Sequence, residues 1–195
     1  MNNREENMTS PLGADRRLDY ENGISFDAFL ASVNANRDLW HALTARASLS
    51  EELVAHAGRI RGQWHLLVIL EDWCGDAVNI VPVLARLVDR VPSITLRVLR
   101  RDEHLALTDE HLTSGKRAIP IVVVLDEDMR EVACWGPRPR VLQQWHRKEG
   151  MSMDKTERYR LMRGWYARDR GRSALAEITA VLCRASSEPE LCSAA

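Results

Sequence analysis

The sequence of 195 residues lacks the features that mark several large classes of protein. It has no run of 18 apolar residues, which excludes a transmembrane helix of ordinary length. The segment from Met1 to Arg17 is polar and charged and contains no apolar signal core, so we expect a cytoplasmic protein. The formal net charge is only −1, and the chain as a whole therefore has no field that favours nucleic acid or a membrane surface.

Cysteine is scarce as well. The four cysteines are too few and too scattered for a disulfide scaffold: Cys74, Cys134, Cys183 and Cys192. None has a cysteine or histidine at the spacing of a metal site, so we expect no metal and no cofactor. The six histidines are dispersed, and none is placed by the sequence beside Cys74, which argues against a cysteine–histidine hydrolase. In a reducing compartment any disulfide would be transient and functional.

Domain organisation follows from the spacing of apolar residues. Residues 1–22 show no periodicity, and we expect a flexible tail there. We expect a single domain over 23–185, followed by a second flexible tail at 186–195. The domain should consist of a helical extension at 23–62, a core at 63–150 and C-terminal helices at 151–185. The extension should contain three amphipathic helices, with Ser50 as the N-cap of the third.

The core combines strands and helices. Apolar runs predict four strands, at about 65–71, 94–100, 121–125 and 130–135. Helical spacing predicts the segments that join or follow them, at about 78–90, 103–112, 138–147, 154–169 and 173–184. Strands separated by helices imply parallel pairing, whereas the turn at Asp126–Asp128 implies an antiparallel hairpin. We therefore predict an α/β protein with a mixed sheet.

The most informative segment is Trp73-Cys74-Gly75-Asp76-Ala77. It follows a buried strand and precedes an amphipathic helix, so Cys74 should lie at a strand-to-helix junction. Unpaired backbone N–H groups and the helix dipole at such a junction favour a thiolate, whereas the nearby carboxylate of Asp76 opposes it. We predict a pKa for Cys74 below the value of about 8.5 that a free thiol has.

These residues resemble a known superfamily. The five-residue segment is similar to the thioredoxin pattern W-C-G-P-C, and three further landmarks follow in order: Pro82, Ile119-Pro120 and Trp135-Gly136. The resemblance to the thioredoxin superfamily implies a four-stranded sheet of order 2-1-3-4, a helix kinked at Pro82, a cis bond before Pro120 and a substrate groove that includes Gly136. More closely, the chain looks like a bacterial thioredoxin-like group with a WCGDA-type motif and a helical C-terminus that contains Trp165–Gly171.

Two departures from the thioredoxin pattern bear on function. Ala77 replaces the second, resolving cysteine, and Val68 occupies the place of the buried aspartate that serves that cysteine. The resemblance therefore implies a protein in which Cys74 alone attacks a disulfide, with a protein or a low-molecular-weight thiol as its partner. The residues expected to shape the groove around Cys74 are Trp73, Gly75, Asp76, Ile119, Pro120 and Gly136.

Alternatives remain open at this point. The groove could serve a binding module without sulfur chemistry, and a third interpretation is a glutathione-ligated iron–sulfur cluster on Cys74. Cys134, just before Trp135, is either a remote resolving thiol or a small core residue. Between Arg138 and Arg172 there are eleven Lys and Arg against four Asp and Glu. This segment is either a patch for RNA, an anionic partner or a phosphorylated ligand, or a solvated helix face with pairs such as Asp154–Arg158.

Overall fold

A four-stranded sheet forms the centre of the molecule in the computed structural model, which describes residues 10–186. Its strands are β1 (Trp64–Leu70), β2 (Ile94–Arg100), β3 (Ile121–Leu125) and β4 (Glu131–Trp135). They lie in the order β2-β1-β3-β4, which confirms the predicted mixed sheet and its order. All five side chains of β3 are buried, as expected for a strand inside the sheet that helices cover on both faces.

The pairing of β3 differs from the simple rule applied to the sequence. β1 and β2 are parallel, but β3 is antiparallel to β1 although helices separate them in the chain. The reason is that Arg100, at the end of β2, pairs with Leu70, and Ile121, at the start of β3, pairs with Ile69. The connection from β2 to β3 therefore begins and ends at the same end of the sheet, next to the C-terminal end of β1. It contains only the short helices η1 (Arg101–Glu103) and α6 (Leu105–Asp109), which do not carry the chain back across the sheet.

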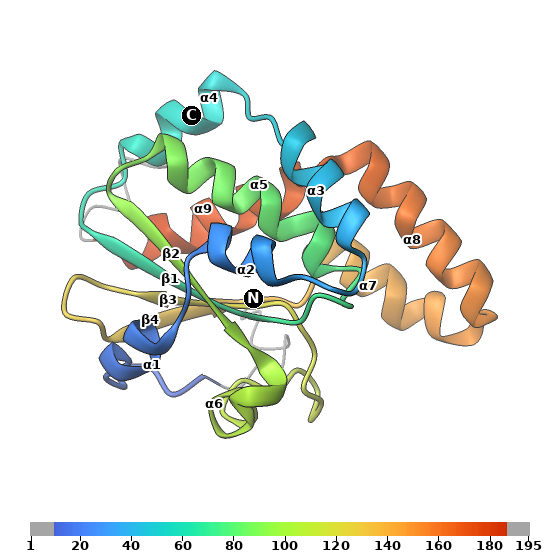
Figure 1. Cartoon of the computed structure of the whole chain (residues 1–195), viewed down its shortest axis with the longest axis horizontal. Helices are drawn as coiled ribbons and strands as arrows, with labels where there is room; N and C mark the ends of the chain where they lie inside the picture. The colour runs from blue at the N-terminus through green and yellow to red at the C-terminus, as the bar shows by residue number, and fades with distance from the viewer. Residues whose placement is uncertain (1–9, 187–195) are drawn as a thin grey trace, which may run out of the picture.

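Helices cover both faces of the sheet. The helix α5 (Ala77–Arg90) contains Pro82 and packs with the C-terminal helix α9 (Arg172–Ala185) on one side of the sheet, whereas α1 (Arg17–Asn22) and α6 lie on the other (Figure 1). The side chains of α5 that face the sheet and α9 belong to the apolar core, together with the buried side chains of β1 and β3. This packing fixes the first turn of α5, where the Cys74 motif ends.

The helical extension packs onto α5 and holds the start of the Cys74 motif. It consists of α2 (Phe26–Ser32), α3 (Arg37–Arg46) and α4 (Glu51–Gly58), and the side chain of Ser50 caps α4 as predicted. The Asp72 carboxylate accepts hydrogen bonds from the backbone N–H groups of Asn34 and Ala35, at 2.8 and 3.2 Å. Trp40 donates its indole N–H to the Asp72 carbonyl oxygen at 2.8 Å. The extension therefore positions the residue just before Trp73.

The prediction of a tail over residues 1–22 is wrong for residues 10–22. These residues include α1, and Tyr20 is buried against the sheet. The guanidinium of Arg16 is buried too, and it donates a hydrogen bond at 2.9 Å to the buried carboxylate of Glu131. A segment without apolar periodicity is thus anchored by a buried ion pair. The spacing of apolar residues cannot predict such a pair, because its two members are distant in sequence. Residues 1–9 and 187–195, which include Cys192, lie outside the described residues.

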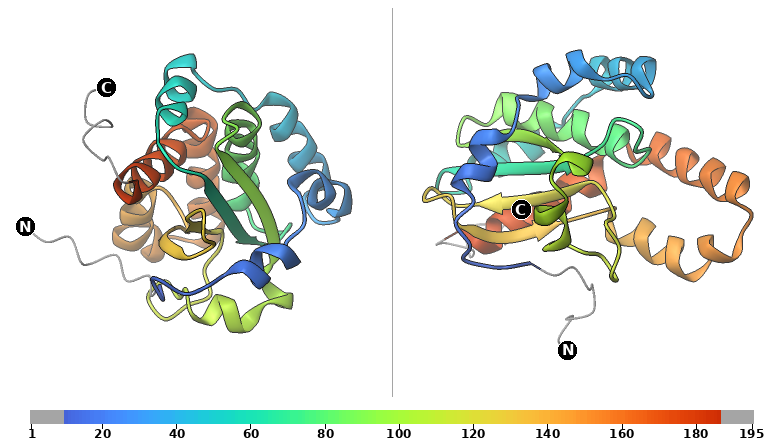
Figure 2. Two further views of the ribbon diagram at one scale, coloured as in Figure 1. Left: turned by 90° about the vertical axis from the view of Figure 1, so that its left-hand side faces the viewer. Right: turned by 60° about the horizontal axis from the view of Figure 1, so that its bottom comes forward.

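The C-terminal part adds three helices beyond β4. They are α7 (Arg140–Lys148), α8 (Lys155–Asp169) and α9, with a short turn η2 (Gly150–Ser152) after α7. Figure 2 shows that α7 and α8 extend past one end of the sheet. Gly171 separates α8 from α9, and its φ of +78° and close packing explain glycine there, because a Cβ would lie 2.2 Å from Val83. Within residues 10–186, no helix combines the length and apolarity needed to cross a membrane.

Candidate functional site

Cys74 lies between the end of β1 and the first residue of α5, as the sequence predicts. Its side chain is only 6% exposed. The sulfur accepts a hydrogen bond from the backbone N–H of Ala77 and donates one to the carbonyl oxygen of Ile119, both at 3.4 Å. The Ile119–Pro120 peptide bond is cis. The strand-to-helix junction and the segment before β3 therefore meet at the sulfur of Cys74.

The direction of the thiol pKa differs from our prediction. Burial, followed by the negative charge of Asp76, raises the pKa of Cys74 to about 11. The backbone N–H groups of Ala77 and Asp76 and the charge of Arg138 lower it, but they do not compensate. The sequence indicated the junction but not the depth at which the sulfur is buried, and burial is the larger effect. At rest, Cys74 is a neutral thiol.

Asp76 belongs to a buried polar network that joins three segments. Its carboxylate lies 2.6 Å from Nη2 of Arg138, which follows β4, and it accepts a hydrogen bond at 2.8 Å from the hydroxyl of Tyr166 on α8. Burial raises the pKa of Asp76, and the charge of Arg138 opposes this shift. Asp76 directly precedes α5, but its side chain makes no capping hydrogen bond there. It connects the motif to α8 instead.

A cleft of about 480 Å³ opens beside Cys74, and we call it the Cys74 cleft. It is lined by five residues of the predicted site: Trp73, Cys74, Gly75, Asp76 and Ile119. Sequence reasoning missed most of the rest of its lining, which includes Arg101, Arg117, Arg138, Lys155, Tyr159, Met162, Arg163 and Tyr166. Three of the missed cations come from the basic segment between Arg138 and Arg172: Arg138, Lys155 and Arg163. The local excess of Lys and Arg in that segment is the signal in the sequence that could have indicated them.

Pro120 and Gly136 support the cleft from behind rather than line it. Gly136 follows the end of β4 and has a φ of +142°, a region that other residues rarely adopt. A Cβ on Gly136 would lie 2.2 Å from the carbonyl oxygen of Pro120. Only glycine lets the end of β4 approach the start of β3 this closely, and the approach fixes Ile119 against the sulfur of Cys74.

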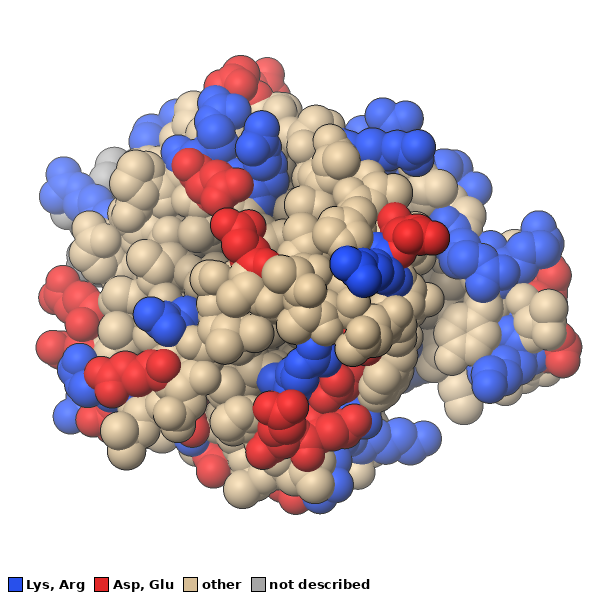
Figure 3. Space-filling view, viewed as in Figure 1, with Lys and Arg blue, Asp and Glu red and all other residues tan. Residues whose placement is uncertain are grey.

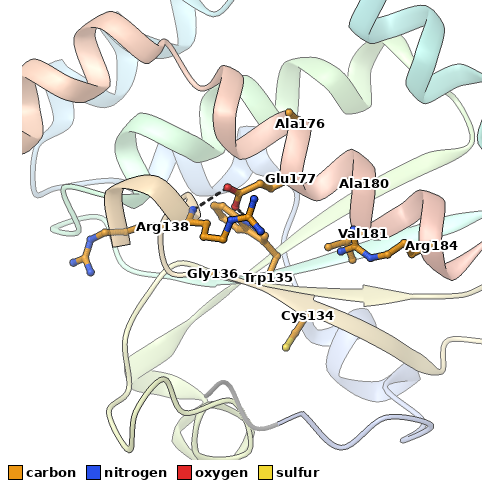
Figure 4. A pocket seen from close by; sticks show the side chains of 10 residues that line it. Cys134, Trp135, Gly136, Arg138, Ala176, Glu177, Ala180, Val181 and Arg184 are labelled. Carbon is orange, nitrogen blue, oxygen red and sulfur yellow. Dashed lines mark hydrogen bonds between the residues drawn. The ribbon is translucent and has the colours of Figure 1, made fainter. Parts of the chain in front are cut away.

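The structure does not bring Cys134 to the Cys74 cleft. Cys134 lines another pocket, of about 400 Å³, together with Glu177 and Arg184 of α9. Figure 4 shows its sulfur pointing away from Glu177, toward the opposite side of the sheet. A bulge between Val124 and Leu125 places Glu131 on the same face as Cys134. Burial raises the pKa of this thiol to about 11 as well. The position fits a half-buried sheet residue better than a resolving thiol.

The basic segment is only in part the solvated face that one interpretation described. Asp154 does not pair with Arg158. Its carboxylate accepts hydrogen bonds from the backbone N–H groups of Thr156 and Glu157 and so caps α8. The surface pair on this helix is instead Arg160 with Glu157, at 2.6 Å. Tyr166 is buried, as expected of a packing residue, but its hydroxyl also serves Asp76.

Comparisons with known proteins agree with this geometry. Among solved structures, a Pseudomonas aeruginosa protein of unknown function is 21% identical, with a TM-score of 0.69 over 89% of this chain and 99% of that one. An HIV epitope-scaffold is 20% identical, with a TM-score of 0.65 over 87% and 98% of the two chains. At such identities the likeness shows the fold alone. No curated protein matches the sequence. A family model described as thioredoxin matches residues 23–155, more than half of the chain, and the protein therefore belongs to the thioredoxin family.

Proposed function

We propose that this chain is a binding protein whose ligand enters the Cys74 cleft, where Cys74 is a neutral contact rather than a redox nucleophile. The observation that carries the proposal is the burial of the thiol, with a pKa of about 11. With that pKa only about one molecule in ten thousand holds a thiolate at pH 7, and the thiolate is the form that attacks a disulfide. The cleft volume of about 480 Å³ lies within the range of small-molecule sites.

The surroundings of Cys74 support the same proposal. Ala77 has no sulfur, and Val68, fully buried in β1, supplies no carboxylate for a second thiol. Cys134 lines a separate pocket. The Asp76 carboxylate, whose negative charge acts on Cys74, is held by Arg138 and Tyr166 and is not free to accept a thiol proton. The finer resemblance to the bacterial WCGDA-type group and the cytoplasmic location remain parts of this proposal.

Thiol–disulfide exchange by Cys74 alone is the second candidate, because its sulfur lines the cleft and the charge of Arg138 favours the thiolate. The thiolate would attack one sulfur of a disulfide, form a mixed disulfide with it and expel the other as a thiolate. A second thiol from solution or from a partner protein would then release the product. An iron–sulfur cluster held by Cys74 and glutathione is a third candidate, and no residue of the cleft other than Cys74 favours it.

The two leading candidates differ in the reactivity of Cys74. A variant with Cys74 as its only cysteine should react with iodoacetamide at pH 7 far more slowly than free glutathione does, and the rate should rise up to about pH 11. It should form no mixed disulfide with oxidised glutathione at pH 7. Cys74→Ser in the same background measures any reaction elsewhere. A thiol pKa below about 8.5 together with rapid mixed-disulfide formation would establish exchange instead.

Restoring the missing sulfur tests the resemblance to dithiol thioredoxins. The natural chain should be inactive in insulin reduction, because Ala77 cannot resolve a mixed disulfide. Ala77→Cys should form a disulfide with Cys74, visible by mass, and should give weak reductase activity that Val68 limits. Cys134→Ser in the Ala77→Cys chain is the matched control and should leave that activity unchanged. If this control abolishes the activity while the fold survives, Cys134 takes part in the chemistry.

A further inference from the structure

We propose that the Cys74 cleft binds a small organic anion whose carboxylate or phosphate groups contact Lys155 and Arg163 on α8. This inference rests on the proposed binding function and names the chemical class of its ligand. Both residues line the cleft and are exposed. Charge-assisted hydrogen bonds from lysine and arginine to such groups are among the strongest polar contacts in proteins.

The charges around the cleft do not balance. Five cations line it against the single acid Asp76: Arg101, Arg117, Arg138, Lys155 and Arg163. Three of the cations already have a carboxylate partner: Arg101 pairs with Asp102, Arg117 with Asp109 and Arg138 with Asp76. Lys155 and Arg163 make no ion pair with any residue of the described part of the chain. Two positive charges therefore face the cleft without compensation, although the whole chain carries a net charge of −1.

The apolar lining indicates more than a bare anion. Trp73 is 48% exposed and Tyr159 43%, and both line the cleft. The guanidinium of Arg101 lies 4.8 Å from the centre of the Trp73 ring, a cation–π contact that holds the indole in place. Exposed aromatic rings next to unpaired cations suit a ligand that has an apolar or ring portion beside its negative groups.

The distribution of charge favours a small molecule over a nucleic acid. Sequence-independent binding of nucleic acid needs an extended row of cations along a groove or face. Figure 3 shows Lys and Arg gathered over α8, but acidic side chains lie among them, and the rest of this face is mixed. Glu157 compensates Arg160 on the same helix. The unpaired cations Lys155 and Arg163 face the cleft, whereas Arg168 of the same helix lies outside it, so the described cations do not form one continuous row.

Titration followed by NMR tests the proposal with probes of matched shape. The titration uses the Cys74→Ser chain, in which the Cys74 thiol cannot react. The result therefore reports binding alone and does not depend on whether Cys74 of the natural chain is reactive. Phenyl phosphate, which has a ring and a dianion, should shift the Trp73 indole and Ile119 signals and should bind more tightly than inorganic phosphate. Benzyl alcohol, a neutral ring, should not bind at the same concentrations. Binding of phenyl phosphate should weaken as salt is added.

Charge-matched variants locate the contact. Lys155→Ala with Arg163→Ala should weaken phenyl phosphate binding about tenfold or more, because charge-assisted hydrogen bonds are lost. Arg160→Ala with Arg168→Ala removes the same charge from the same helix outside the cleft and should change binding less than about twofold. Equal loss in both pairs would mean a general field of α8 and overturn the proposal. Equal binding of benzyl alcohol, or no binding of any anion, would also overturn it.

Discussion

Asp76→Asn is expected to lower the pKa of the Cys74 thiol by about one unit and to raise its alkylation rate at pH 8 about tenfold. The carboxylate is the largest charge that disfavours the thiolate, and only burial has a larger effect. Asparagine keeps an oxygen that can accept the hydrogen bond from Tyr166, so the connection to α8 survives. The charge of Arg138, no longer paired, then favours the thiolate further.

The measurement is the pH dependence of alkylation in the chain that has Cys74 as its only cysteine. Tyr166→Phe is the matched control, because it removes a hydrogen bond to Asp76 and leaves the carboxylate in place. That variant should not lower the pKa of Cys74. If Asp76→Asn leaves the pKa near 11, burial alone sets it, and the Asp76 network does not control the thiol.

The result also bears on the choice between binding and exchange. An Asp76→Asn protein that forms mixed disulfides readily would show that one carboxylate keeps a competent thiol inactive. Because that carboxylate contacts Arg138 and Tyr166, such a result would mean that residues far from the motif in sequence influence the reactivity of the thiol through Asp76. A variant that stays unreactive would strengthen the binding proposal, since the groove would then lack an active sulfur even without the opposing charge.

Local patterns explain why the sequence predicted the fold. The buried run of β3, the apolar spacing of α5 and the cap at Ser50 each depend on a few neighbouring residues, and all are present as expected. The Ile119–Pro120 bond is cis and lies against Cys74, the arrangement that the resemblance implied. The direction of β3 relative to β1 was not a local property, because it depends on where a connection of about twenty residues begins and ends.

The rest of the site depends on residues that are distant in sequence. Arg138 and Tyr166 are 62 and 90 positions from Asp76, and no periodicity links either residue to it. The sequence showed the basic segment but not that α8 turns Lys155 and Arg163 toward Cys74. The thiol pKa was predicted in the wrong direction because a motif gives the helix terminus and the nearby charge, whereas burial is set by the whole surrounding structure.

Gly136→Ala is expected to destabilise the fold by about 3 kcal/mol or more, the largest effect of any methyl addition near the site. A Cβ there would lie 2.2 Å from the carbonyl oxygen of Pro120. Because the contact is with backbone and not with a flexible side chain, it can be relieved only if β4 moves away from β3. The φ of +142° adds strain that any residue with a Cβ must bear. Since β3 starts at Ile121, this movement would also shift Ile119 from the sulfur of Cys74.

Urea unfolding measures the loss, and Gly75→Ala is its matched control. Gly75 lines the same cleft, but a Cβ added to it meets nothing within 4 Å, and its φ is not in the left-handed region. We therefore expect the Gly75 variant to lose less than about 1 kcal/mol. If Gly136→Ala is as stable as Gly75→Ala, the close approach of β4 to Pro120 is not required for the fold. If it is destabilised but folded, faster alkylation of Cys74 at pH 8 should accompany the loss, because a displaced Ile119 exposes the thiol.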